Sequence, residues 1–244
     1  FFDSMRFDNI DNTDASLFNI TFLKNNRKIP INDLSTGEKQ IVCRGARILK
    51  NLKVLNDSII LIDEPELSMH PSWQKKIYNF YCNLFSGKGL NEQIFIATHS
   101  EYVIESALSD PDCLVILLND NTGVVNARNV SGPFILDSLT SSEINYEAFG
   151  LYSVDYHIAL YAKYQNKTGN LSIQKTDKLI SNEPNYNPSL HERISSYIDR
   201  NGSSHNFKTL PTLIRNCIDH PNNGYSFSSD DLKTSIEFLR SICK

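Results

Sequence analysis

The stretch Ile59-Ile60-Leu61-Ile62-Asp63-Glu64 decides the fold of this chain. Its four aliphatic residues form an uninterrupted apolar run, which is typical of a strand buried on both faces of a parallel sheet. Two carboxylates follow directly, at the carboxyl end of the strand, where open α/β sheets bind their ligands. The stretch therefore predicts an α/β fold with an acidic site at one edge of a mostly parallel sheet.

Residues 1–140 continue this pattern on both sides of the run. One helix is expected over residues 38–55 and another beginning at Pro71, each with apolar residues near the helical period. Further strands are expected at residues 18–22, 28–31, 94–97, 113–118 and 124–125, with Asn25-Asn26 turning the first hairpin and 124–125 forming an antiparallel edge. Strands that alternate with helices predict a sheet flanked by helices.

The pattern changes near residue 140. From Ser141 onward the chain shows helical periods separated by segments rich in Asn, Gly and Pro. The expected helices cover residues 143–166, 171–181, 188–200, 207–219 and 229–243. No stretch has the alternation of a convincing strand, so we expect residues 141–244 to form an all-α helical bundle.

Composition excludes several classes of protein. The 244 residues carry a net charge of −4, which argues against a chain that binds nucleic acid along its whole length. No run approaches the roughly 20 apolar residues of a membrane span. The five cysteines show no CxxC or Cys/His metal spacing and indicate free thiols in the cytoplasm. The chain begins at Phe1 without a signal pattern, and we expect it to be a fragment of a longer protein.

Three motifs follow one another in the first part of the chain. They are Leu34-Ser35-Thr36-Gly37-Glu38-Lys39-Gln40, then Asp63-Glu64 after the apolar run, then Ala97-Thr98-His99-Ser100 after a second strand. Alone, each also fits an ordinary helix cap, an exposed turn or a polar strand end. Their order and spacing together predict a site for a nucleoside triphosphate.

The residue types suit that chemistry. Asp63 lies at the strand tip, where a carboxylate can hold Mg²⁺ while phosphates complete the metal's ligands. Glu64 can orient or deprotonate the attacking water. His99, at the tip of a neighbouring strand, can donate a hydrogen bond to the γ-phosphate or to that water. We therefore expect Asp63 as the metal ligand and Glu64 and His99 as the catalytic residues.

The first motif supplies the expected phosphate-binding residues. Ser35, Gly37 and Glu38 stand at the start of the helix expected over residues 38–55. A helix N-terminus presents N–H groups and a partial positive charge to an anion. We therefore expect these three residues to contact the nucleotide.

These motifs resemble those of the ATP-binding-cassette (ABC) superfamily, in the branch with SMC-like and OLD-like ATPases. Residues 34–40 match the signature motif, residues 59–64 the Walker B strand and His99 the switch histidine, within a resemblance covering residues 15–120. It implies that residues 1–140 are the C-terminal lobe of an ABC-type ATPase that uses ATP and Mg²⁺. It also implies a homodimer or higher oligomer, in which Ser35 and Gly37 act on the ATP of the partner.

Two details refine the resemblance. Glu66-Leu67-Ser68-Met69-His70-Pro71 looks like the version of this segment found in OLD-like and bacterial defence ATPases, which argues against a transporter subunit. No GxxxxGK[ST] motif is present, and Ser86-Gly87-Lys88-Gly89 is expected to be a plain loop after a helix. The Walker A lobe is therefore expected upstream in the parent chain or on another chain, and this fragment alone should hydrolyse nothing.

Residues 141–244 carry a second, shorter resemblance. Arg215, Asn216 and His220 resemble the Arg-x4-His motif of HEPN-like helical bundles, whose active members are metal-independent ribonucleases. Pro221 pushes His220 out of helical geometry, so that its ring could turn back toward Arg215. Two interpretations stay open: a ribonuclease site, or a structural or dimerising module. His157 is interpreted as a packing histidine.

The function expected from these patterns is that of an ATP-binding and ATP-hydrolysing subunit of a bacterial antiphage defence or toxin-like system. ATP-dependent dimerisation would gate an effector, with RNA cleavage by the helical bundle itself as one version. The alternatives are a non-nucleolytic ATPase sensor or scaffold that docks a separate nuclease subunit, and a DNA-repair ATPase of the SMC kind.

Overall fold

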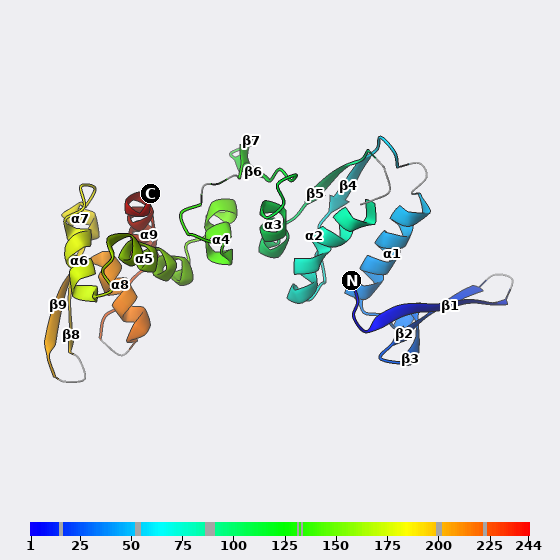
Figure 1. The fold of residues 1–244 in the computed structure, drawn as a ribbon, viewed down its shortest axis with the longest axis horizontal. Helices are drawn as coiled ribbons and strands as arrows, with labels where there is room; N and C mark the ends of the chain where they lie inside the picture. The colour runs from blue at the N-terminus through cyan, green and yellow to red at the C-terminus, as the bar shows by residue number, and fades with distance from the viewer. Residues whose placement is uncertain are drawn as a thin grey trace. The chain divides into compact units, whose positions relative to one another are not determined.

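The protein is described by a computed structural model whose elements are shown in Figure 1. The described residues are 1–14, 17–51, 55–85, 91–130, 132, 134–198, 202–221 and 224–244. Contacts divide the chain into two compact units, Phe1–Cys113 and Leu114–Lys244. This division falls earlier in the chain than the composition change near residue 140.

An antiparallel three-stranded sheet opens the first unit. It consists of β1 (Met5–Asp14), β2 (Leu17–Lys24) and β3 (Arg27–Pro30), in that order. The predicted hairpin is confirmed, because Asn25 and Asn26 both take positive φ values and join β2 to β3 in a two-residue turn. β1 was not expected: a register shift between Phe7 and Asn9 interrupts the alternation that would have marked a strand.

A parallel pair of strands and three helices complete the first unit. The short 3-10 turn Ile31–Asp33 leads into α1 (Thr36–Lys50), followed by β4 (Ile59–Asp63), α2 (Pro71–Phe85), β5 (Gln93–Ala97) and α3 (Glu101–Leu108). β4 and β5 pair in parallel, as expected, but β4 is not buried on both faces, because Ile59 and Leu61 are exposed. α2, which was expected, buries Ile77 and Tyr81. It packs against α3, a helix that the sequence analysis did not predict.

The expected strand over residues 113–118 does not join this parallel sheet among the described residues. β6 (Ile116–Asn121) starts later and pairs antiparallel with β7 (Val124–Asn129), forming a separate hairpin in the second unit. Thr122 and Gly123 both take positive φ values, and such a two-residue turn favours direct antiparallel pairing. The antiparallel edge is confirmed, whereas its place in the sheet of β4 and β5 is not.

Helices dominate the remainder of the second unit. They are α4 (Ser141–Phe149), α5 (Val154–Thr168), α6 (Ile173–Ser181), α7 (Pro188–His191), α8 (Leu210–Asp219) and α9 (Ser229–Cys243). One helix was expected over residues 143–166, but Gly150 ends α4 at φ +66° and Ser153 caps α5. The core lies where α5, α8 and α9 meet, around Leu160, Ile214 and Leu239.

The expectation of an all-α bundle is wrong. Where a helix was expected over residues 188–200, α7 is a single turn and is followed by β8 (Glu192–Ile198), which pairs antiparallel with β9 (Ser204–Thr209). The helix expected from residue 207 consequently begins at Leu210. The pattern hid this hairpin because Ile194 and Ile198 are exposed while Ser195 is buried, the reverse of a normal amphipathic strand.

The expected loop at residues 86–89 lies outside the described residues. Among the helices that the structure describes, none combines the length and apolar character that crossing a bilayer requires.

Candidate functional site

Glu64 and His99 meet at the carboxyl edge of the parallel strands. Asp63 and Ala97 are opposite one another at the ends of β4 and β5, so the residues that follow emerge side by side. Nε2 of His99 lies 3.9 Å from Oε1 of Glu64. The His99 side chain is 85% exposed and that of Glu64 42% exposed, so both are open to a ligand from solvent. The structure thus brings together two residues that the sequence analysis paired for catalysis.

The backbone of Glu64 is held in a strained conformation. Its φ of +40° is uncommon for a residue with a side chain and typically costs on the order of 1–3 kcal/mol. The Glu64 N–H donates to the carbonyl of Ala97 at 2.9 Å, and its carbonyl accepts from the Leu67 N–H at 3.2 Å. Nη1 of Arg44 on α1 also donates to this carbonyl, at 3.4 Å. These contacts fix the direction in which the carboxylate leaves the strand.

Asp63 is exposed at the last position of β4, while its carbonyl accepts from Nη1 of Arg44 at 3.4 Å. Within the described residues, no three His, Cys, Asp or Glu side chains gather to form a metal site by themselves. Mg²⁺ commonly takes only one or two protein carboxylates and completes its octahedron with water and phosphate oxygens. An exposed Asp63 beside Glu64 fits that requirement.

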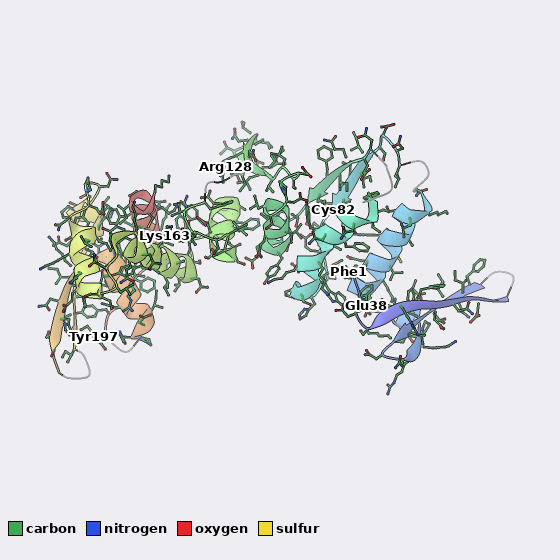
Figure 2. The ribbon with its side chains drawn as sticks, viewed as in Figure 1. Phe1, Glu38, Cys82, Arg128, Lys163 and Tyr197 are labelled. Atoms are coloured by element: carbon green, nitrogen blue, oxygen red, sulfur yellow. The ribbon has the colours of Figure 1, made fainter. Side chains whose placement is uncertain are left out.

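The start of α1 is a capping box. The Ser35 hydroxyl accepts from the Glu38 N–H at 3.3 Å, and the Ser35 N–H donates to the Glu38 carboxylate at 2.9 Å. Nζ of Lys24 lies 2.6 Å from the other carboxylate oxygen of the buried Glu38, which Figure 2 labels. Burial alone would raise the pKa of Glu38, but the hydrogen bonds from Lys24 and Ser35 outweigh it and lower that pKa. Glu38 therefore organises the helix terminus from within the unit.

Gly37 is buried where α1 meets the segment after β4. A Cβ at this position would stand 2.8 Å from the carbonyl oxygen of Ser68 and 3.5 Å from the ring of Trp73. Ser68 itself has a φ of +61°. Glycine is needed here because the two backbones approach too closely for any side chain. The first motif and the segment after the Walker B-like strand are thus packed together.

Glu66, Arg44 and Thr98 were not among the expected site residues. Oε1 of Glu66 accepts from the Thr98 hydroxyl at 2.7 Å and from the His99 N–H at 3.0 Å. The only sequence signal for Glu66 was its place in the segment that begins the E-x-x-x-H-P pattern. Thr98 stood within the third motif but was given no role, and Arg44 gave no signal, because their contacts depend on how distant segments meet.

Arg215, Asn216 and His220 lie at the end of α8 in the second unit. Nη2 of Arg215 contacts the Asp219 carboxylate at 2.5 Å, and Nη1 donates to Oδ1 of Asn216 at 3.2 Å. The ring of His220 stacks on Tyr197 of β8, with centroids 4.5 Å apart. Within the described residues, no hydrogen bond or ion pair joins His220 to Arg215. The unexpected hairpin explains the difference, because it supplies the ring on which His220 rests.

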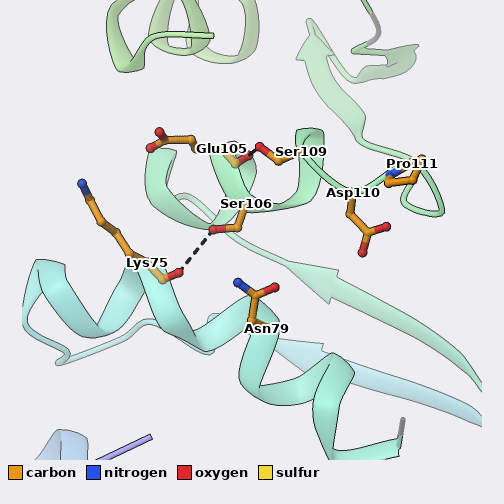
Figure 3. A pocket seen from close by; sticks show the side chains of 7 residues that line it. All are labelled: Lys75, Asn79, Glu105, Ser106, Ser109, Asp110 and Pro111. Carbon is orange, nitrogen blue, oxygen red and sulfur yellow. Dashed lines mark hydrogen bonds between the residues drawn. The ribbon is translucent and has the colours of Figure 1, made fainter. Parts of the chain in front are cut away.

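A cavity of about 490 Å³ lies between α2 and α3, apart from these motifs. It is lined by Lys75, Asn79, Glu105, Ser106, Ser109, Asp110 and Pro111, which Figure 3 shows. The Ser106 hydroxyl donates across it to the carbonyl of Lys75 at 3.3 Å. None of the expected site residues contributes to its lining, so the candidate site is the open edge of β4 and β5 and not this cavity.

Comparison with known proteins relates this chain to probable ATPases. Residues 2–105 match the family described as "AAA domain, putative AbiEii toxin, Type IV TA system". A "Retron Vc95 probable ATPase" of Vibrio cholerae serotype O1 biovar El Tor is 30% identical over 172 residues, covering 66% of this chain and 32% of that protein. A "Retron Ec83 probable ATPase" of Escherichia coli is 37% identical over 89 residues, covering 33% of this chain and 16% of that protein.

The chain thus spans less than a third of the length of these curated relatives. A solved structure described as "Structural biochemistry of ATP-driven dimerization and DNA stimulated activation of SMC ATPases" superposes with a TM-score of 0.41 and 16% identity, covering 52% of this chain and 73% of that one. Residues 2–105 are therefore similar to the AAA domain of that family, and larger parts of the chain are similar to probable ATPases from retrons.

Proposed function

We propose that this chain supplies the hydrolytic edge of an ABC-type ATPase, with Glu64 as the general base and His99 as its partner at the γ-phosphate. The 3.9 Å approach of His99 Nε2 to the Glu64 carboxylate, at the end of a parallel strand pair, carries this proposal. A carboxylate there can orient a water and accept its proton as the phosphoryl group is transferred. The match to AAA-type and retron ATPases supports the same chemistry.

Asp63 is the residue of this chain that would hold Mg²⁺. When bound, the metal neutralises charge on the β- and γ-phosphates and lowers the barrier to transfer. Arg44 and Ala97 bind the backbone of Asp63 and Glu64, which limits how far this backbone must move during the reaction. His99 can donate a hydrogen bond to a γ-phosphate oxygen or to the attacking water.

The N-terminus of α1 is proposed to act on ATP held by a second copy. Its first turn presents backbone N–H groups that lack partners within the helix, and Ser35 and Glu38 pre-order this turn before any ligand arrives. Gly37 allows the turn to lie directly against Ser68. ATP would then be the bridge of a homodimer or higher oligomer.

The missing Walker A lobe is proposed to cover one face of β4 and β5. On that face Ile59, Leu61 and Phe95 are 66%, 78% and 48% exposed, although apolar strand residues normally pack against a second layer. The opposite face is more buried, with Ile62 8% exposed. An apolar face of this kind suits a protein layer, which fits a chain spanning under a third of its curated relatives.

The whole protein is proposed to work in a bacterial defence or toxin-like system, where ATP-driven closure gates an effector. The names of the retron ATPases support this setting. For the second unit we favour a docking or dimerising role over RNA cleavage, since Arg215 is paired with Asp219 and His220 is stacked on Tyr197. A DNA-repair ATPase of the SMC kind is the remaining alternative.

ATP turnover by the full-length protein tests the proposal. Glu64→Gln should lower kcat by about 10²-fold or more, because the amide cannot accept the proton. Glu105→Gln on α3 is the matched control and should keep wild-type turnover. Wild-type activity in Glu64→Gln, or the same loss in both variants, would overturn the assigned role.

A further inference from the structure

Glu66 has a hydrogen-bonding pattern that the proposed reaction does not use. It lies in the segment between β4 and α2 and is only 9% exposed. One carboxylate oxygen, Oε1, accepts both the Thr98 hydroxyl at 2.7 Å and the His99 N–H at 3.0 Å. The other oxygen, Oε2, is buried and has no hydrogen-bond partner among the described residues. A buried carboxylate that is only half satisfied lowers stability, so the fold alone gives no reason for a charge here.

The loop that Glu66 holds is tied down at a second point. The Ser100 N–H donates to the Thr98 hydroxyl at 3.0 Å, and the Ser100 hydroxyl donates to Oε1 of Gln74 at 2.7 Å. Gln74, at the start of α2, in turn donates to the Met69 carbonyl at 3.1 Å. These bonds connect the end of β5 to the segment that follows β4. Thr98 and Ser100 are thus held through their side chains, whereas the side chain of His99 remains 85% exposed.

We infer that Glu66 is a positioning residue that fixes the backbone of His99, so that the exposed ring faces the Glu64 carboxylate. A histidine ring with little contact of its own can be directed only through its backbone, and the His99 N–H is the backbone group that Glu66 binds. Hydrogen bonds to an ionised acceptor are the strong ones, which suits this task. The inference rests on the proposed function, because placing the His99 ring affects turnover only if His99 takes part in ATP hydrolysis.

A double-mutant cycle in the full-length protein tests the inference. Glu66→Ala should lower kcat for ATP hydrolysis by about 10- to 100-fold and change KM for ATP by less than about 3-fold, because the ring is misplaced only for the chemical step. Glu66→Gln keeps an acceptor oxygen and should recover most of the loss. In a His99→Ala protein, adding Glu66→Ala should cost less than about 3-fold more, since both changes remove one function.

Asp110 provides a matched control at the far end of α3. Its carboxylate also accepts one hydroxyl, from Tyr78 at 2.7 Å, and one backbone N–H, from Asp112 at 3.0 Å. Asp110→Ala should therefore remove the same kinds of bond and leave kcat within about 3-fold of wild type. An equal loss in Asp110→Ala, additive losses in the cycle, or a Glu66→Gln variant as slow as Glu66→Ala would each overturn the inference.

Amide hydrogen exchange separates this inference from the proposed function. In the full-length protein the His99 N–H should exchange at least about 10-fold faster in Glu66→Ala than in wild type, because its acceptor is gone. Unchanged exchange would overturn the inference whatever the turnover. If Glu64→Gln hydrolyses ATP normally while His99 exchange responds to Glu66, the proposed function fails and the placement of His99 by Glu66 stands.

Discussion

The buried Gly37 faces the backbone of Ser68 so closely that a Cβ would stand 2.8 Å from the Ser68 carbonyl oxygen. Gly37→Ala should therefore destabilise the protein by about 1–3 kcal/mol, since backbone must move to admit the methyl group. The measurement is urea unfolding of the full-length protein. Gly45→Ala on the same helix is the control: its Cβ would meet the ring of Phe80 at 3.2 Å, and a side chain moves more easily than backbone. An equal cost for both variants would contradict the argument.

The Lys24–Glu38 ion pair, which joins β2 to α1, should contribute far more to folding stability than the Lys28–Asp8 pair within the sheet. Glu38 has only 4% of its side chain exposed, and Lys24→Met leaves that carboxylate buried with one partner fewer, at a cost of about 1–3 kcal/mol. Lys28→Met breaks a contact with Asp8 in which the lysine is 70% exposed and screened by solvent, and should cost much less than Lys24→Met. Denaturant titration of both variants checks this. The same small effect in both would show that Glu38 is not held as described.

Acid should weaken the second unit through His157. Burial lowers the pKa of His157 from its usual 6.5 to about 3, while Nε2 contacts the Ser235 hydroxyl at 3.0 Å. Between pH 6.5 and 3, His157 is therefore protonated in the unfolded chain but neutral in the folded chain. This contribution is complete above pH 6.5 and falls by about 1.4 kcal/mol per pH unit below it. His157→Gln should flatten the pH dependence of unfolding in that window; an unchanged slope would contradict a buried neutral histidine.

His220 should contribute to stability through Tyr197. Aromatic stacking of this kind is worth about 0.5–1.5 kcal/mol, so His220→Ala and Tyr197→Ala should each lower unfolding stability and their effects should not add. In a growth assay of cells that express the full-length protein, we expect His220→Ala and the unsubstituted protein to give the same result, because the proposed role of the second unit needs no cleavage by His220. Growth inhibition by the unsubstituted protein that His220→Ala abolishes, with unchanged stability, would instead favour the ribonuclease interpretation of Arg215 and His220.

Local signals were enough to predict much of the fold. The Asn25-Asn26 turn, the apolar run of β4 and the helix of residues 229–243 each depend on neighbours in sequence. The hairpin of β8 and β9 could not be predicted in this way. In β8 the buried residue is Ser195 while Ile194 and Ile198 are exposed, and the hairpin packs against α6, which lies earlier in the chain, and against α8, which follows β9 directly.

The candidate site could be predicted in part, where its residues follow directly on predicted strands. Strand order placed Glu64 and His99 at one edge, and their 3.9 Å separation agrees with that expectation. Glu66 and Arg44 were missed because their roles are defined by carbonyl and N–H groups of other segments, which leave no pattern in sequence. The positive φ of Glu64 likewise had no sequence signal.

The nucleotide retained by the Glu64→Gln variant tests the central claim most directly. The full-length variant is incubated with MgATP, freed of unbound nucleotide, and its bound nucleotide identified. Because the amide cannot accept a proton from the attacking water, the account predicts that ATP is recovered intact long after the wild-type protein has converted it to ADP. Recovery of ADP from the variant as fast as from wild type would contradict it.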